Sequence, residues 1–446
     1  MRLATTAPDA PVRVPPDARP IHPSEFDAWM ARLGPFETAP CLALAVSGGR
    51  DSMALALLAG DWARAQGGQV LAVTIDHGLR PESAAEAGQV ADWMQTHGNP
   101  HEIMRWASPV SGAGLEAAAR NARYGLLDAM CRERGLLHLL VGHHQSDQDE
   151  TREMRRQRGS GVIGLAGMAA IREMASMRVL RPLLTVPRDR ITATLLDRGQ
   201  DWIEDASNGD LRFERARLRN VAVQSESGAT FALAGQHRRD HEQAVAALAA
   251  RVVAVDPAGV MTIDVAAFRD SDAALSRSLL ANVITSVSGG IYPPRGARLS
   301  RLWERVTRGD LDRTATLGGC VIRPGRAARA GQIDIARENA AIAPALAVTG
   351  PEMSWDGRFR VRADAPGTPG LCIDALGRAG ARHPDGAGHP DYARLAPDVR
   401  AGLPALYRNG ELAARPCFSA TAQAPETCRI RFAPRKPLAG AAFGNV

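Results

Sequence analysis

A chain of 446 residues is long enough for two or three domains, each with a hydrophobic core of its own. No apolar run approaches the ~20 residues of a membrane helix, so we expect a protein without a membrane partner. The six cysteines are scattered without a CxxC pair, which argues against a zinc ribbon or an iron–sulfur site and indicates a reducing, cytoplasmic compartment.

The net charge of +6 suits an anionic partner. All but one of the 54 basic residues are arginine, a side chain that stacks on bases and pairs with phosphates. A GC-rich genome would also exchange lysine for arginine, and the many alanines and glycines favour that explanation. The charge by itself is therefore weak support for RNA binding.

The first half of the chain alternates strand-like and helix-like segments, which is typical of an α/β fold with a doubly wound parallel sheet of Rossmann-like type. We predict strands at residues 41–46, 70–75, 101–106 and 136–142, and helices at 83–96 and 114–134. Ligands of such sheets bind beyond the carboxyl ends of the strands, and three polar clusters fall there.

Composition divides the chain into four segments. Residues 1–35 are predicted to be a flexible, proline-rich extension, and residues 36–225 to be the α/β catalytic domain. Residues 226–345 have a mainly helical pattern and are assigned to a substrate domain, with a basic amphipathic stretch at 298–306. Glycine- and proline-rich stretches surround a small C-terminal domain at 346–446.

After the first strand comes the loop Ser47-Gly48-Gly49-Arg50-Asp51-Ser52, and a helix-forming segment follows it. Glycines let the backbone turn and approach a ligand, and the free N–H groups of a helix start attract phosphate. A Walker A loop needs a lysine there, but Lys436 is the one lysine of the chain and Pro437 follows it. A dinucleotide fingerprint does not fit either. The pattern matches the pyrophosphate loop of ATP pyrophosphatases, with an ordinary strand-to-helix turn as the alternative.

Polar side chains also follow the second and fourth strands. Asp76 could bind adenosine or a metal, or could form a turn. His143 and His144 precede Asp147 and Glu150, which are three residues apart and could hold Mg²⁺ from one helix face. Helix capping is the alternative for this second cluster.

Arg120 and Arg123, three residues apart on the helix at 114–134, project from one face and suit a phosphate or a charge that develops on a reacting oxygen. A salt bridge to Glu116 is the alternative. The glycine-rich residues 158–168 are predicted to be a mobile loop over the site. Residues 201–208 place carboxylates beside an aromatic side chain, which could receive a cationic amine or form a turn.

These motifs occur in the order SGGRDS, DHGLRPES, AARNARY, GHHQSDQDET, RGSGVIGLAGM, RPLL and DWIEDASN. In this combination the sequence resembles the tRNA(Ile)-lysidine synthase family of PP-loop ATP pyrophosphatases. The likeness is dense over residues 41–220, and weaker matches continue at 292–295, 316–320 and 436–438.

The resemblance implies a ligase of the cytoplasm that acts in two steps. ATP adenylates the ring carbonyl oxygen of the wobble cytidine in an isoleucine tRNA with the anticodon CAU, and pyrophosphate leaves. The amine of free L-lysine then displaces AMP, which gives lysidine. The segments at 226–345 and 346–446 would contact the tRNA, and a homodimer is compatible with this reading.

The resemblance also implies residue roles. ATP would bind to one set of residues: Ser47, Gly48, Gly49, Arg50, Asp51, Ser52 and Asp76. Asp51 and Asp147 would bind Mg²⁺. Arg120 or Arg123 would steady the activated oxygen, and His143 with Asp147 would position ATP or the metal.

Three places depart from the family pattern. Ser146 replaces the first of two adjacent aspartates, Arg152 and Glu153 replace apolar residues, and Ala206 replaces a proline. The lost carboxylate could weaken metal binding, and the polar helix face implies altered packing. Two other functions stay open: a related tRNA thiolase, which would usually carry CxxC pairs, and a weakened paralogue that only binds tRNA.

Overall fold

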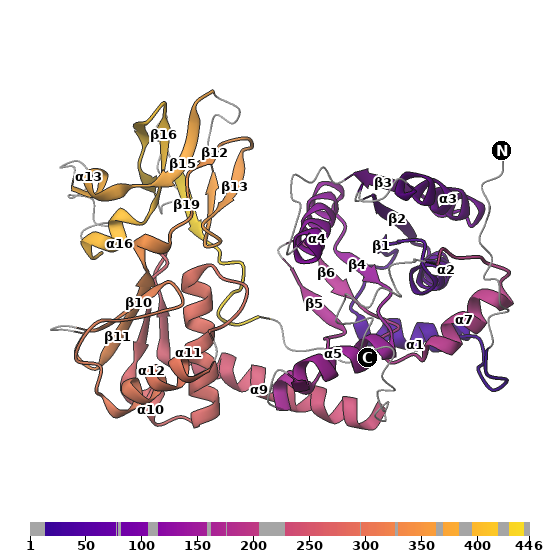
Figure 1. The fold of residues 1–446 in the computed structure, drawn as a ribbon, viewed down its shortest axis with the longest axis horizontal. Coiled ribbons are helices and arrows are strands. Elements are labelled where there is room, and N and C mark those ends of the chain that lie inside the picture. Colours follow the sequence, from indigo (N-terminus) through magenta and orange to yellow (C-terminus); the bar gives the residue numbers. More distant parts are fainter. Residues whose placement is uncertain are drawn as a thin grey trace. The chain divides into compact units, whose positions relative to one another are not determined.

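The structure is a computed structural model that describes residues 14–446 apart from 77, 79–81, 106–114, 158–161, 175, 205–227, 295, 326–328, 363–368, 383–394, 418–427 and 441–446. The chain divides into two compact units (Figure 1), a first unit of Met1–Asp240 with Ala441–Val446 and a second unit of His241–Gly440. The boundaries expected at residues 225 and 345 stay predictions. No helix in the described ranges is both long and apolar enough to cross a membrane.

The first unit is built on a six-stranded sheet with the order β3-β2-β1-β4-β6-β5. Its strands are β1 (Cys41–Ala45), β2 (Gln69–Asp76), β3 (His101–Arg105), β4 (His138–Val141), β5 (Ile171–Glu173) and β6 (Arg178–Leu180). All neighbouring pairs run parallel except β5 and β6. The prediction of a mainly parallel, doubly wound α/β sheet is therefore confirmed, with one antiparallel strand at its edge.

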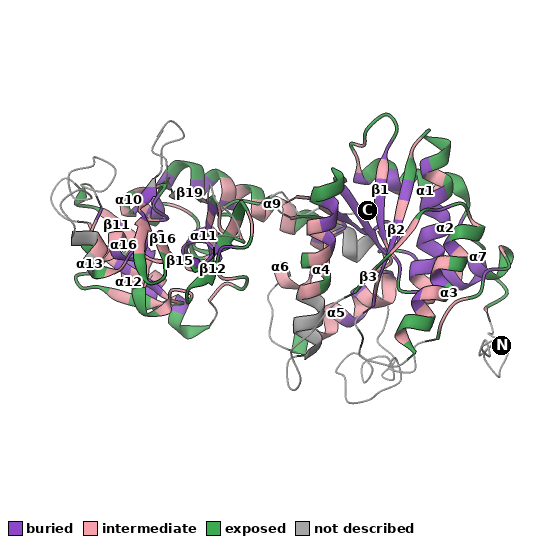
Figure 2. Ribbon diagram, turned by 90° about the horizontal axis from the view of Figure 1, so that it is seen from above, coloured by how far each residue is buried: buried purple, intermediate pink, exposed green. Residues whose placement is uncertain are grey.

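Helices cover both faces of this sheet because side chains alternate along its strands. Leu42 and Leu44 face one layer of helices and Ala43 faces the other. The first layer contains α2 (Arg50–Ala65), α3 (Ser83–Thr96) and α7 (Arg188–Asp197), and the second contains α4 (Leu115–Arg134). Figure 2 shows the buried strands between α4 on one side and α2 with α7 on the other. Each fully buried leucine contributes roughly 1.5–3 kcal/mol to folding stability. Burial of both faces of β1 therefore stabilises its place in the interior of the sheet.

Residues 23–33, expected to belong to a flexible extension, instead form helix α1 (Pro23–Leu33). His22 and Glu25 close a capping box at its start, and Phe26, Met30 and Leu33 are buried in the core beside α2. The proline-rich composition concealed this helix, because a proline in the first turn starts a helix rather than breaking it.

The second unit begins within the long helix α9 (Gly228–Val252) and continues with α10 (Val265–Arg269), α11 (Ala273–Ser288) and α12 (Ala297–Arg308). The same segment also holds a five-stranded antiparallel sheet of the order β7-β8-β11-β10-β9, which the expectation of a mainly helical domain did not include. Its strands are β7 (Val253–Val255), β8 (Met261–Asp264), β9 (Ala315–Leu317), β10 (Cys320–Pro324) and β11 (Gln332–Arg337).

Two four-stranded sheets complete the second unit. One has the order β12-β15-β16-β17: β12 (Leu346–Ala347), β15 (Leu371–Ala375), β16 (Pro404–Arg408) and β17 (Glu411–Ala414). The other has the order β13-β14-β19-β18: β13 (Glu352–Trp355), β14 (Phe359–Arg362), β19 (Cys428–Phe432) and β18 (Pro416–Cys417). Helices α13 (Gly377–Arg382) and α16 (Pro397–Ala401) lie between β15 and β16, and η3 (Asn339–Ala341) precedes β12.

Candidate active site

The loop after β1 is held in one shape by its own serines. The Ser52 hydroxyl donates to the carbonyl oxygen of Gly49 at 2.8 Å and accepts the backbone N–H of Ser47 at 3.2 Å. Helix α2 then starts with Gly49 as its N-cap, and no side chain among the described residues caps it. Helix-start N–H groups that lack a side-chain cap are available to bind a phosphate.

Gly48 cannot be replaced without disturbing this loop. Its φ of 82° lies in the left-handed region, and a Cβ atom would come within 2.6 Å of Ile203 and 2.7 Å of Val90. The carbonyl oxygen of Gly48 also accepts the N–H of Ile203 at 2.9 Å. The segment after α7 is thus fastened directly to the phosphate loop.

The end of β4 lies against the start of α2. A Cβ atom on Gly142 would be 2.8 Å from the carbonyl oxygen of Asp51, so only glycine permits this approach. The next turn brings His144, which is 4% exposed, to the carboxylate of Asp51, with 3.4 Å between Nε2 and Oδ2. Of the two adjacent histidines, it is therefore His144 that faces the loop. The predicted residue, His143, accepts a hydrogen bond from Arg181 at 3.2 Å instead.

His144 also begins helix α5 (Gln145–Gln157). Its Nδ1 accepts the N–H of Ser146 at 3.1 Å, and its own N–H donates to Oδ2 of Asp147 at 3.0 Å. Because Nδ1 is an acceptor, the neutral ring carries its proton on Nε2, directed at Asp51. The capping alternative for Asp147 is therefore present in the structure. Ser146 takes part in the cap only through its backbone N–H, so its side chain is not needed there.

The charges in this cluster shift both pKa values. Burial raises the pKa of Asp51, but the hydrogen bond and charge of His144, with the nearby arginines, more than offset this and hold it below its ordinary value. Burial lowers the pKa of His144, yet Asp51 and Asp147 raise it above its ordinary value. The carboxylate of Asp51 is therefore charged at neutral pH, as a metal ligand or a phosphate-site base must be.

The second oxygen of Asp51, Oδ1, is buried and finds no hydrogen-bond partner in the described part of the chain. A buried carboxylate oxygen without a partner is costly unless a ligand completes it, and Mg²⁺ prefers such oxygens. Asp51 therefore fits a metal ligand. Oδ2 of Asp147 is already occupied by the N–H of His144, which leaves Asp147 its other oxygen or a bridging water.

The side chain of Arg50, at the start of α2, contacts Glu204 and Trp202. Its Nη2 lies 2.6 Å from Oε1 of Glu204, and its guanidinium lies 4.9 Å above the ring of Trp202. The indole N–H of Trp202 donates to the same Glu204 oxygen at 2.7 Å. Glu204 thus binds an arginine of the phosphate loop, whereas the sequence left a receptor for a cationic amine and a turn as alternatives for this segment. The rest of that motif, residues 205–208, lies outside the described residues.

Arg188, which the sequence reading missed, stands at the first position of α7. The N–H of Gln145 donates to the carbonyl oxygen of Val186 at 3.1 Å, so the starts of α5 and α7 are neighbours. Arg188 Nε is buried, and within the described ranges it makes no hydrogen bond. Its charge also acts on Asp51: burial raises the pKa of that carboxyl, and Arg188 helps His144 to lower it below its ordinary value. The signal available in the sequence was an arginine after the proline that follows RPLL, at the start of a helix.

The other predicted residues are placed as follows. Asp76, 8% exposed, accepts the N–H of Gly78 at 2.9 Å and the hydroxyl of Ser83 at 2.6 Å, which is the turn that the sequence left open. Arg123 is exposed on α4. Arg120 belongs to the same helix, but its side chain lies outside the described residues, so its predicted role stays a prediction.

Part of the glycine-rich stretch expected to be a mobile loop is a structured segment. Residues 162–165 form the short helix α6 (Val162–Leu165), and Gln148 exchanges two hydrogen bonds with Met168, at 2.6 and 3.0 Å. Arg155 donates to the carbonyl oxygens of Gly164 and Gly167 at 2.7 and 2.6 Å. The polar face of α5 therefore has a packing role: it fastens this segment. Residues 158–161 lie outside the described residues.

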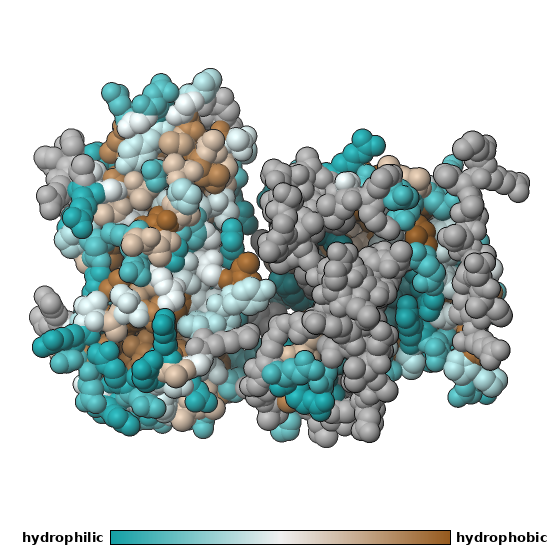
Figure 3. Space-filling view, viewed as in Figure 1, coloured by the Kyte–Doolittle hydropathy of each residue, from teal (hydrophilic) through white to brown (hydrophobic). Residues whose placement is uncertain are grey.

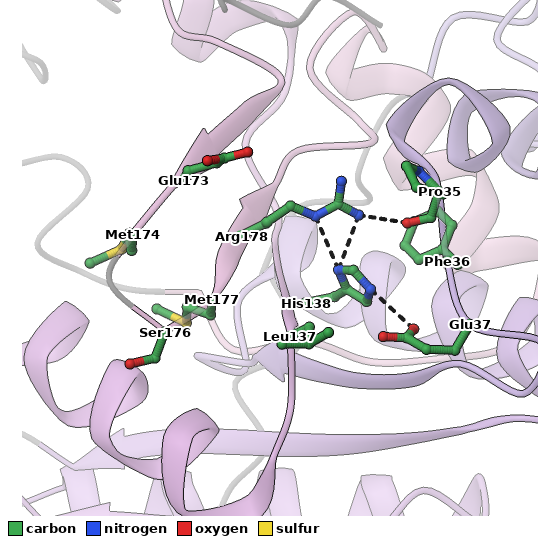
Figure 4. A pocket seen from close by; sticks show the side chains of 10 residues that line it. All are labelled: Pro35, Phe36, Glu37, Leu137, His138, Glu173, Met174, Ser176, Met177 and Arg178. Atoms are coloured by element: carbon green, nitrogen blue, oxygen red, sulfur yellow. Dashed lines mark hydrogen bonds and ion pairs between the residues drawn. The ribbon is translucent and has the colours of Figure 1, made fainter. Parts of the chain in front are cut away.

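A cavity of about 520 Å³ lies elsewhere on the first unit (Figure 4). It is lined by the first residues of β4 and β6, His138 and Arg178, together with Phe36, Glu37 and the turn between β5 and β6. Since these strands are parallel to β1, their amino ends lie at the sheet edge opposite to the phosphate loop. The cavity is therefore not part of the candidate active site.

The strand, the glycine bend and the uncapped helix start define a nucleotide-binding domain of the pyrophosphate-loop class. In agreement, the PP-loop domain family matches residues 24–226 of this chain. The tRNA(Ile)-lysidine synthase of Methylobacterium nodulans is 38% identical over 316 residues, which are 68% of this chain and 90% of that protein. The tRNA(Ile)-lysidine synthase of Brucella suis is 35% identical over 412 residues, 86% of this chain and 88% of that protein.

The chain belongs to the tRNA(Ile)-lysidine synthase family. Its PP-loop domain makes ATP the expected nucleotide, and the family is the one that the sequence motifs resembled. The solved structure of the U34-tRNA thiolase NcsA from Methanococcus maripaludis is less similar, with a TM-score of 0.41, 14% identity, and coverage of 48% of this chain and 77% of that one.

Proposed function

We propose that this chain joins free L-lysine to the wobble cytidine of isoleucine tRNA with the anticodon CAU, at the expense of ATP. Family membership along most of the chain supports this function. The observation that carries it is the start of α2 beneath Gly48, which no described side chain caps, with a buried oxygen of Asp51 beside it that has no hydrogen-bond partner among the described residues. Such a site is built for the phosphates of ATP and a cation.

In the first step the carbonyl oxygen of the cytosine base attacks the α-phosphorus of ATP, the bond between the α- and β-phosphates breaks, and pyrophosphate departs. The N–H groups at the start of α2 and the guanidinium of Arg188 would neutralise the triphosphate. Mg²⁺, when bound, supplies further neutralisation of phosphate charge, and Oδ1 of Asp51 would hold it. His144 fixes the other oxygen of the same carboxylate, which orients Oδ1.

In the second step the lysine amine attacks the activated ring carbon. A carbon–nitrogen bond forms as the carbon–oxygen bond to AMP breaks, and the amine releases a proton. Adenylation is needed because the cytosine carbonyl has no good leaving group of its own. Arg123 and Arg120 of α4 stay the proposed partners of the activated oxygen, and a homodimer stays a prediction.

The test is to incubate the full chain with the tRNA transcript, ATP, Mg²⁺ and isotopically labelled lysine. Mass analysis of the nucleoside at the wobble position should show a labelled lysidine, and chelation of Mg²⁺ should abolish it reversibly. A methionine tRNA with the same anticodon is the matched control for substrate choice. An unmodified cytidine in the presence of all components would overturn the proposal, whereas sulfur incorporation would point to a thiolase.

A further inference from the structure

Helix α12 presents a row of arginines on one side. At 100° per residue, Arg298, Arg301, Arg305 and Arg308 fall within an arc of about 80°. Leu299, Leu302 and Val306 occupy a different arc and are buried in the core of the second unit. Arg298, Arg301 and Arg308 are exposed, and Arg305 is half-buried. We call these four side chains the α12 arginine row.

The charge of this row is only partly compensated. Glu304 is the one acid of the helix, and its carboxylate lies 3.8 Å from Arg308, whose side chain is 70% exposed. In Figure 3, strongly hydrophilic side chains gather over the part of the second unit where Figure 1 labels α10 and α12. The row extends over about 15 Å of helix with one arginine per turn, a spacing that suits consecutive phosphates of one strand.

An exposed aromatic side chain precedes the row. Tyr292 is 80% exposed and its neighbour Ile291 is 45% exposed. Only residues 293–296 separate Tyr292 from the first residue of α12, so the Cα atoms of these two residues are at most about 17 Å apart. A large aromatic ring left in water on a folded protein is typical of an interaction surface.

The backbone that carries Tyr292 is fastened at both sides. Gly289 and Gly290 donate to the carbonyl oxygens of Ser286 and Thr285 at 3.3 and 3.2 Å and close the end of α11. On the other side, Pro294 packs beside Gly318 in the turn between β9 and β10. The tyrosine is therefore presented on a short, anchored segment, which reduces the entropy lost when its ring stacks on a ligand.

We propose that Tyr292 stacks on an unpaired base of the tRNA while the α12 arginine row neutralises the neighbouring phosphates. This inference rests on the proposed function for the identity of the RNA. The combination of an aromatic platform with a cationic row is the common means of binding single-stranded nucleic acid, because every base has a face that can stack. Four arginines against one acid make an RNA the fitting occupant by charge, in preference to a second copy of this basic chain.

The first measurement is the affinity of the full chain for the tRNA. Tyr292→Ala should weaken binding about 5- to 100-fold, and Tyr292→Phe and Tyr292→Trp should retain it, because both keep a ring that stacks. Leu346→Ala truncates another exposed apolar side chain of the second unit and is the matched control. Equal affinities of Tyr292→Ala and the unchanged protein would overturn the inference.

The arginine row is tested by salt. The double substitution Arg301→Gln with Arg305→Gln should weaken binding and reduce the slope of log affinity against log salt by about 1.4. Arg431→Gln, an exposed arginine on β19, should leave the slope unchanged. A tRNA that contains 5-iodouridine in its unpaired positions should crosslink to Tyr292 on irradiation; crosslinks confined to other residues would contradict the assignment.

Two outcomes distinguish a failure of the Tyr292 stacking role from a failure of the proposed lysidine synthesis. If the unchanged protein forms lysidine and Tyr292→Ala forms it with the same KM for tRNA, only the stacking role fails. If no lysidine forms but the tRNA still binds through Tyr292, the function fails and the RNA surface stands. A change of oligomeric state in Tyr292→Ala, measured by sedimentation, would assign the surface to a second copy of the chain and overturn the RNA contact.

Discussion

His144 and His138 stand at opposite edges of one sheet and are buried to the same degree, at 4% and 3% exposure. Each ring lies close to a carboxylate, at 3.4 Å from Asp51 for His144 and at 3.1 Å from Glu37 for His138. Burial lowers the pKa of both. Nevertheless the pKa of His144 ends above its ordinary value and that of His138 ends below it.

The difference comes from the second partner of each ring. His144 lies between two carboxylates, since Asp147 is 3.8 Å from its Nδ1. His138 instead accepts hydrogen bonds from Arg178 at 3.2 and 3.3 Å, and the positive charge of Arg178 opposes a proton on the ring. Arg178 also donates to the carbonyl oxygen of Pro35 at 2.8 Å. At the amino ends of the strands (the amino edge), His138 and Arg178 are hydrogen-bonded to each other and to Glu37 and Pro35, as Figure 4 shows. At the carboxyl ends (the carboxyl edge), Oδ1 of Asp51 has no partner among the described residues and is available to a ligand.

The largest expected effect follows from removing that carboxylate. Asp51→Asn keeps the size of the side chain but removes the charge, so lysidine formation should fall about a hundred- to a thousandfold. Glu37→Gln makes the same change beside His138 and should leave activity within about twofold. The rate of lysidine formation under saturating tRNA measures both, and comparable losses in the two variants would contradict the contrast between the edges.

Alanine substitutions at two glycines with positive φ, Gly48 and Gly78, distinguish the cost of a steric clash from the cost of backbone strain. Gly48→Ala should destabilise the fold by about 2–4 kcal/mol, since it adds a left-handed alanine and forces Ile203 and Val90 apart. Gly78, with φ of 60°, has nothing in the described part of the chain within 4 Å of the position that a Cβ atom would take, so Gly78→Ala should cost only about 1 kcal/mol. Urea unfolding of both variants gives the comparison, and equal losses would remove the argument for close packing at Gly48.

The next prediction concerns the contribution of Arg188 to ATP binding beside the phosphate loop. Arg188→Gln should raise the KM for ATP or lower kcat about 10- to 100-fold, because a half-buried positive charge beside the phosphate loop is lost. Arg190→Gln, two residues further along α7, breaks a half-buried, two-bond ion pair with Glu25 at 3.0 and 2.7 Å and should cost about 1–3 kcal/mol of stability without affecting the exchange reaction. ATP–pyrophosphate exchange distinguishes them, and an unchanged exchange rate in Arg188→Gln would remove this residue from the site.

The sequence predicted the sheet and the phosphate loop because both depend on local patterns: an apolar run, a glycine bend and a helix former. It named His143 where the structure brings His144 to Asp51, because the residue that faces Asp51 is set by how the chain leaves β4. It left the carboxylates of residues 201–208 as an amine receptor or a turn, and it could not show the ion pair of Glu204 with Arg50, which joins residues 154 positions apart. Arg188 was missed for the same reason: its proximity to Asp51 exists only once α5 and α7 start side by side.

The smallest effect concerns the pH dependence of stability at the amino edge. His138 has a lowered pKa in the folded state, so the unfolded chain binds more protons once the pH falls below about 6.5, and folding stability is lost as the pH falls toward the folded pKa. His138→Gln can still donate to Glu37 and accept from Arg178, and should cost about 1 kcal/mol at pH 7.5. Because glutamine does not titrate, the deficit of the variant should shrink at pH 5.5. Urea unfolding of both proteins at the two pH values measures this, with the contribution of the other histidines cancelling in the difference. A deficit that grows at pH 5.5 would mean that the folded state holds His138 protonated, and that the carboxylate of Glu37 rather than Arg178 controls the amino edge.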